Sequence, residues 1–206
     1  MNARVSNWHS ELHTRSLLSL LIAVIATLSL TASGQTASVA NNTAGASKSL
    51  LPRHVVVPKS VVNRFFPEVT REEKTGENVT AVGNPKATRS VVYANSDSSK
   101  RVTISVDQYQ TTSDASSAYQ EAVTKSKSVP GFKPVTAENL GQNAFVGTVT
   151  QGGETHIGLG TLHGTLIVGV TLAGYDPAPD KIANLVSLTR EEESAAKATL
   201  DAKSKK

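Results

Sequence analysis

The sequence predicts a single α+β domain, in which helices cover an antiparallel sheet of about five strands. Three strand-like runs separated by glycine-containing turns within residues 144–172 predict an antiparallel meander. Apolar residues at helical spacing occur before, between and after the strand-like segments. The chain has 206 residues, which leaves room for one ordinary domain beside a short N-terminal segment.

Composition excludes several classes of protein. The chain has no cysteine, which rules out a disulfide framework, a thiolate nucleophile, a thiolate metal centre and a lipid-modified N-terminal cysteine. Its net charge of +4 is spread along the chain, and only 4% of its residues are aromatic. Because nucleic-acid-binding proteins need basic stripes and stacking platforms, we expect no nucleic-acid partner.

The N-terminal segment has the arrangement of a secretory signal. Arg4 and Arg15 precede an uncharged, mostly apolar run at residues 17–30, and small residues follow it. This run is shorter than the roughly 20 apolar residues that cross a bilayer. We therefore expect residues 1–33 to be a signal peptide with an undecided cleavage site. The alternative is a membrane anchor formed by residues 17–33, and both give a secreted, extracytoplasmic or cell-surface protein.

The remaining chain divides by composition. Residues 34–49 are small and polar, which predicts a flexible linker rich in Ser, Thr and Ala. Residues 50–190 are expected to form the α+β domain, and residues 191–206 its charged C-terminal helix end or tail. Two Asn-x-Thr triplets, which begin at Asn41 and Asn78, match the glycosylation pattern and are interpreted as chance matches.

The first elements of the domain are a helix and a hairpin. Apolar residues at helical spacing follow Pro58 and predict a short helix that ends at Pro67. Residues 70–86 are charged and rich in turn formers. Residues 90–94 and 101–109 then flank a polar turn, and the second run alternates apolar and polar residues, so we expect a β-hairpin.

A second helix is expected between the hairpin and the meander. Its possible capping residues are Thr112 to Asp114, its apolar stripe is mostly alanine, and it ends before Pro130. A small stripe allows the helix to approach a sheet closely. A third helix opens at Pro179, and we expect its first two turns to pack and the residues beyond Arg190 to be solvated or frayed.

The meander carries the most distinctive residues. Glycines interrupt its strands, and a strand glycine marks a bulge or a close approach, either by the protein's own helix or by a ligand. The glycine-lined face is therefore the speculative ligand site. Its candidate residues are Thr148, His156, Gly158, Gly160 and Thr171.

We find no catalytic motif, and we expect no catalytic residue, metal site or cofactor. The segment Gly158 to Gly164 misses the dinucleotide fingerprint by one residue and lies inside the meander instead of between a strand and a helix. His156 and His163 could face each other across neighbouring strands, but no third ligand is placed to complete a metal site.

The order of elements resembles two kinds of exported protein. The features that carry the resemblance are the small-residue linker, the helix after Leu50-Leu-Pro52, the helix around Ala118-Tyr119, the segment Leu140–Phe145 and the strand after Gly164. Together they resemble small actinobacterial envelope lipoproteins and the extracellular sensor domains of mycobacterial serine/threonine kinases. The resemblance implies an α+β domain with a binding or sensing role. The chain departs from both groups because it lacks the lipobox cysteine and the disulfide cysteines.

These observations predict an exported, non-catalytic binding or sensing domain of the cell envelope or extracellular space. Its partner would be a small ligand or an envelope component, and the membrane is a partner only through an uncleaved N-terminal segment. Two alternatives stay open. One is a structural or adhesive surface protein tethered by its N-terminus, and the other is a small secreted hydrolase.

Overall fold

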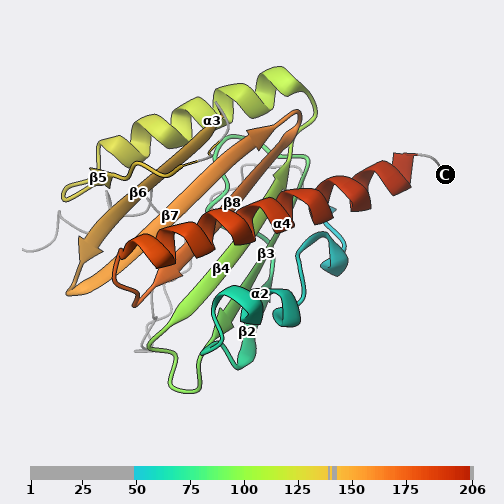
Figure 1. Cartoon of the computed structure of the whole chain (residues 1–206). Helices are drawn as coiled ribbons and strands as arrows, with labels where there is room; N and C mark the ends of the chain where they lie inside the picture. Colours follow the sequence, from blue (N-terminus) through green and yellow to red (C-terminus); the bar gives the residue numbers. More distant parts are fainter. Residues whose placement is uncertain (1–48, 139, 141–142, 205–206) are drawn as a thin grey trace, which may run out of the picture.

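The computed structural model describes residues 49–138, 140 and 143–204. The predicted signal peptide, the triplet at Asn41 and all of the predicted linker except Ser49 lie outside these residues. The described chain forms one eight-stranded mixed sheet and three α-helices (Figure 1). The predicted α+β class is therefore confirmed, whereas the expected number of about five strands is wrong.

The sheet is mostly antiparallel, and its strands run in the order β1-β3-β4-β8-β7-β6-β5, with β2 also paired to β3. Only the short pairing of β1 with β3 is parallel among the described strands. The strands are β1 (Ser49–Leu50), β2 (Arg71–Gly76), β3 (Ala87–Ala94), β4 (Arg101–Gln108), β5 (Lys133–Pro134), β6 (Ala144–Gln151), β7 (Glu154–His163) and β8 (Leu166–Ala173).

The predicted hairpin and meander are both present. Strands β3 and β4 form the hairpin, and β6, β7 and β8 form the meander. Strand β8 then pairs along its whole length with β4, which joins the hairpin to the meander in one continuous sheet. Strand β2 was not predicted, because its sequence Arg-Glu-Glu-Lys-Thr-Gly has no apolar alternation and none of its side chains is buried.

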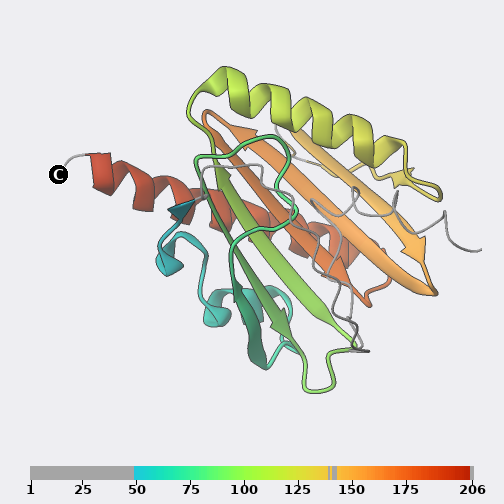
Figure 2. The same cartoon turned by 180° about the vertical axis from the view of Figure 1, so that it is seen from behind.

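The two faces of the sheet have different covers. The face that carries Val102, Ile104 and Val106 of β4 forms the main core with helices α2 (Lys59–Phe65) and α4 (Pro179–Ser204) and the 3₁₀ turn η1 (Arg53–Val55). We call this the α4 face. Helix α3 (Thr112–Lys127) packs on the opposite α3 face against Leu162 and Ile167 (Figures 1 and 2).

A capping residue precedes helix α3, as the sequence predicts, but the cap is Thr111, one residue before the predicted candidates. The side chain of Thr111 accepts a hydrogen bond from the backbone N–H of Asp114 at 3.1 Å, which is the geometry of an N-cap. The acidic side chain of Asp114 also lies in the first turn, where it opposes the helix dipole. The small residues Ala115 and Ala118 are buried against the sheet.

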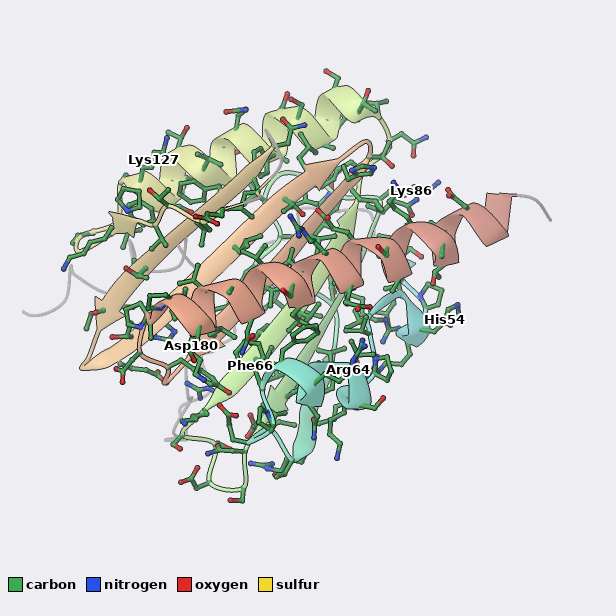
Figure 3. All side chains as sticks on the ribbon, viewed as in Figure 1. His54, Arg64, Phe66, Lys86, Lys127 and Asp180 are labelled. Atoms are coloured by element: carbon green, nitrogen blue, oxygen red, sulfur yellow. The ribbon has the colours of Figure 1, made fainter. Side chains whose placement is uncertain are left out.

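Helix α4 crosses the sheet diagonally and continues well past Arg190 (Figure 1). Glu192 and Ala196 are fully buried, so the expectation that this part is solvated is wrong. Its cover is the N-terminal segment around η1, where the hydroxyl of Thr199 donates to the carbonyl of His54 at 3.3 Å. Figure 3 shows Asp180 at the start of α4 and His54 beside its C-terminal half.

The loop between β2 and β3 is held by a buried asparagine. Asn78 is 3% exposed, and its side-chain amide donates to both carboxylate oxygens of Asp107 at 3.0 and 2.9 Å. Its carbonyl oxygen accepts from the backbone and the hydroxyl of Thr80. The Asn-x-Thr triplet at this position is therefore a turn motif of the fold.

In the part of the chain that the structure describes, no helix is long and apolar enough to span a bilayer.

Candidate functional site

The structure divides the predicted ligand residues between the two faces of the sheet. Thr171 lies opposite Gly158 in the β7–β8 ladder, and His156 and Gly160 share that face because they alternate with Gly158 along β7. Thr148 lies opposite Ile157, whose side chain belongs to the main core on the α4 face. The five residues therefore do not form one site, and Thr148 is separated from the other four by the sheet.

His156 takes part in a charged cluster on the α3 face. Its Nε2 lies 3.4 Å from Oε2 of Glu154, whose two oxygens accept from Arg101 at 3.0 and 3.1 Å. Burial lowers the pKa of His156 below its ordinary value, and the neighbouring Glu154 opposes this shift. The cluster ties β4 to β7 across Ala173 of β8, which is a structural role.

The suggested pairing of two histidines is wrong. His156 and His163 lie near opposite ends of the same strand, β7, and their positions differ by seven, an odd number, so their side chains point to opposite faces. They cannot ligate one metal ion. Among the described residues, no group of three or more His, Cys, Asp or Glu side chains could hold a metal.

A different concavity lies on the α4 face, along helix α4. On one side it is bounded by α4, and on the other by the segment after β5 and the adjoining ends of β6 and β7. It consists of two cavities that share Val186 and Arg190 and have volumes of about 530 and 190 Å³. We call the two cavities together the α4 groove. Its α4 lining extends from Pro179 to Glu193, a rise of about 20 Å along the helix.

The larger cavity is the apolar section of the groove. Aliphatic and proline side chains dominate its lining, and they come from α4 and from the segment after β5. The polar members are Thr136, Glu138, Ser187 and Arg190. A volume in this range is typical of pockets that hold small organic ligands. The apolar lining residues are Val135, Ala137, Pro177, Pro179, Ile182, Ala183 and Val186.

The smaller cavity is the polar section. It continues along α4 from Val186 to Glu193 and reaches the start of β6 and the end of β7. Thr161 and Thr189 are both buried there, at 7% and 2% exposure. The hydroxyl of Thr189 donates to the carbonyl of Leu185 at 2.8 Å, whereas the buried hydroxyl of Thr161 has no partner among the described residues. The other polar lining residues are Asn143, His163, Arg190 and Glu193.

The polar section does not contain an assembled catalytic pair. A hydroxyl nucleophile is activated by a base in hydrogen-bond contact with it. Among the described residues the hydroxyl of Thr161 has no hydrogen bond, so it is not engaged by His163. The arrangement is suited to holding a molecule with one apolar and one polar end.

Sequence reasoning missed the groove for a specific reason. Its walls are far apart in the sequence, because α4 faces residues 135–138, 140, 143 and 144 only after β8 has returned the chain across the sheet. The one local signal is the stripe of α4 formed by Ile182, Val186 and Thr189, and such a stripe is equally typical of a helix face packed in the core. The unsatisfied hydroxyl of Thr161 has no sequence signature.

No protein-family model and no curated protein matches this chain. Among solved structures, the fold is similar to the extracellular domain of PknH from Mycobacterium tuberculosis, with a TM-score of 0.50 and 12% identity over 68% of this chain and 93% of that domain. A second similar structure is LpqN, involved in cell envelope biogenesis of the same organism, with a TM-score of 0.30 and 15% identity over 59% of this chain and 76% of LpqN. The similarity to the PknH extracellular domain confirms, at the level of fold, the resemblance to extracellular domains that was stated from the sequence.

Proposed function

We propose that the chain is an exported, non-catalytic binding domain that holds a small amphiphilic molecule in the α4 groove. The observation that carries the proposal is the division of the groove. An apolar cavity of about 530 Å³ opens at Val186 and Arg190 into a polar cavity of about 190 Å³. A ligand with an apolar portion and a polar head would bury both portions against matching side chains.

Two further observations support this function. The N-terminal sequence has the features of a secretory signal, and the fold is similar to that of an extracellular domain. A location outside the cytoplasm would bring the groove into contact with amphiphiles of the cell envelope or the surrounding medium. The absence of a hydrogen bond to the Thr161 hydroxyl among the described residues favours binding over hydrolysis.

The test is to fill the groove with a single side chain. Ala183 is exposed on α4 and lines the apolar section, so Ala183→Trp would block it. Ala198 is exposed on the same helix beyond the lining residues, and Ala198→Trp is the matched control. The probe is 1-monolauroylglycerol, and its binding to the full chain purified from the expressing host is measured by calorimetry.

We expect the wild type and Ala198→Trp to bind the probe equally. Ala183→Trp should bind it at least about tenfold more weakly, because its indole ring occupies space in the apolar section and removes apolar contact with the probe. Equal binding by all three proteins, or none by the wild type, would overturn the proposal. Release of laurate from the probe would instead support a hydrolase. Native mass spectrometry of the same preparation tests for a molecule that co-purifies with the wild type and is lost from Ala183→Trp.

A further inference from the structure

Resting on the proposed function, we propose that the polar section of the α4 groove selects a polyhydroxylated head group, and that Glu193 is the residue that determines this specificity. The ligand class is then an amphiphile with an apolar chain and several hydroxyls. The observation behind this proposal is a change of character along the groove face of α4, which is apolar near its start and charged at Arg190 and Glu193.

One face of α4 lines the whole groove. Its lining residues recur three or four positions apart, which is the spacing of a single helix face. Pro179, Ile182 and Val186 belong to the apolar part of this face. Arg190 and Glu193 follow on the same face and line the polar section. An apolar chain that lies along the first part of α4 would therefore place its head group beside these two charges.

Three polar side chains of this section can be reached from the cavity. Arg190 and His163 are exposed, and Glu193 is half-buried. His163 comes from the opposite wall. It lies four residues after Leu159 on β7, so it shares the α4 face with that core residue. A head group in the cavity therefore meets hydrogen-bonding side chains on both walls.

These side chains differ in what they can bond. The guanidinium of Arg190 only donates hydrogen bonds, the carboxylate of Glu193 only accepts them, and a neutral imidazole at His163 does both. A hydroxyl group also does both, so a head with several hydroxyls can donate to Glu193 and accept from Arg190 at the same time. Hydrogen bonds to charged groups are stronger than those between neutral groups.

Charged head groups fit the polar section less well. A phosphate gains from Arg190 and is repelled by Glu193, whereas a quaternary ammonium meets the reverse arrangement and has no hydrogen to donate. A zwitterionic head could pair with both side chains, but it must lose the hydration of its own two charges. A polyol has no charge of its own to desolvate, so the polar section favours it.

The experiment uses four probes that share the dodecyl chain and differ in the head group. They are dodecyl glucoside, dodecylphosphocholine, dodecyl phosphate and dodecyltrimethylammonium, each used below its critical micelle concentration. Calorimetry measures their binding to the full chain. Glu193→Ala removes the acceptor, and Glu193→Gln keeps an acceptor oxygen without the charge. Glu191→Ala is the matched control, because Glu191 is exposed on the same helix and lies outside the lining residues.

We expect the wild type to bind dodecyl glucoside at least about tenfold more tightly than the other three probes. Glu193→Ala should bind it about tenfold more weakly, because one hydrogen bond to a charged group is lost. Glu193→Gln and Glu191→Ala should retain most of the wild-type affinity. Glu193→Gln should also bind dodecyl phosphate more tightly than the wild type does, because the repulsion by the carboxylate is gone. A purely structural role of Glu193 would not produce this last change.

The failures of the two proposals are distinguishable. If the wild type binds neither 1-monolauroylglycerol nor any of the four probes, the proposed function itself is wrong. If it binds a charged or zwitterionic probe as tightly as dodecyl glucoside or more tightly, the polyhydroxylated head is wrong, although the groove would still bind amphiphiles. An equal loss of affinity in Glu193→Ala and Glu191→Ala, or no loss in either, overturns the role of Glu193.

Discussion

The backbone N–H of Val57 donates to Oε2 of Glu192 at 2.9 Å, a contact between residues 135 positions apart. The carbonyl of the same residue accepts from the Tyr93 hydroxyl at 2.6 Å, and Arg53 donates to that hydroxyl at 2.7 Å. Side chains from α4 and β3 thus satisfy both polar backbone groups of Val57. These bonds fix the segment that follows η1 between α4 and the sheet.

The first prediction concerns the pH dependence of stability. Glu192 is fully buried, and burial raises its pKa to about 8, against the opposing effects of the Val57 N–H and Arg53. Between about pH 4.5 and about pH 8 the folded protein keeps this proton and the unfolded chain has lost it. The free energy of unfolding should therefore fall as pH rises through this window, by up to about 1.4 kcal/mol per pH unit.

Glu192→Gln isolates this contribution. The glutamine carbonyl can still accept from Val57, and the side chain no longer titrates, so the variant should gain stability over wild type as pH rises. The matched control is Glu191→Gln, which changes an exposed carboxylate beside Arg64. Urea unfolding at about pH 5, 7 and 8 measures the difference. A parallel pH slope in wild type and Glu192→Gln would contradict the prediction.

The second prediction has the opposite sign. Burial lowers the pKa of His156, so the folded state favours the neutral ring. Its contribution to stability is present above the unfolded pKa of about 6.5 and is lost as pH falls toward the folded pKa. His156→Gln should lose less stability than wild type between about pH 7 and about pH 5. His163→Gln, an exposed change at the other end of β7, is the control for the substitution itself. Ring-proton titration by NMR gives the pKa of His156 directly.

The third prediction is that Asn78 carries no glycan, even in a host that glycosylates secreted proteins. Its amide nitrogen is buried and donates twice to Asp107, so it is inaccessible once the loop has folded. Asn78→Ala should lower the free energy of unfolding by about 1–3 kcal/mol, because it removes two hydrogen bonds to the buried carboxylate of Asp107. Peptide mapping of the protein expressed in such a host checks the first statement, and detection of a sugar at Asn78 would refute it.

The fourth prediction concerns a strand glycine. A Cβ atom on Gly147 would overlap the ring of Phe132 and lie 3.1 Å from the carbonyl of Lys133. Gly147→Ala should cost about 1–3 kcal/mol, since the ring must move. Gly76→Ala is the control, because a Cβ there meets no atom within 4 Å. Phe132→Leu should recover part of the stability that Gly147→Ala loses. Equal stability of Gly147→Ala and Gly76→Ala in urea would show that Phe132 does not pack against Gly147.

Local periodicity was sufficient to predict the hairpin, the meander and the helices. Strand β4 alternates cleanly through Val102, Ile104 and Val106, and α3 follows a capping threonine, although this is Thr111 and not one of the predicted candidates. Strand β2 escaped prediction because an edge strand with exposed charges has no apolar signature. The burial of Glu192 was not predicted, because three consecutive glutamates are typical of a solvated helix face. Only its hydrogen bond from the distant Val57 explains why this glutamate is buried.

The candidate site was less predictable, because it depends on register. A shift of one residue moves a side chain to the other face of a sheet. The β6–β7 register pairs Val149 with His156, and this pairing separates Thr148 from the residues with which it was grouped. The α4 groove further depends on the angle at which α4 crosses the sheet, and no short segment of sequence encodes that angle.

The pairing of β4 with β8 has a consequence for how the protein folds. The hairpin and the meander each join neighbouring strands and can form early, because short loops close at little entropic cost. The ladder from Gln108–Leu166 to Arg101–Ala173 unites them only after the chain between β4 and β8 has been ordered. A chain that emerges N-terminus first would therefore present an unpaired edge of β4 until β8 arrives. We expect the pairing of β4 with β8 to be the step that limits the refolding rate.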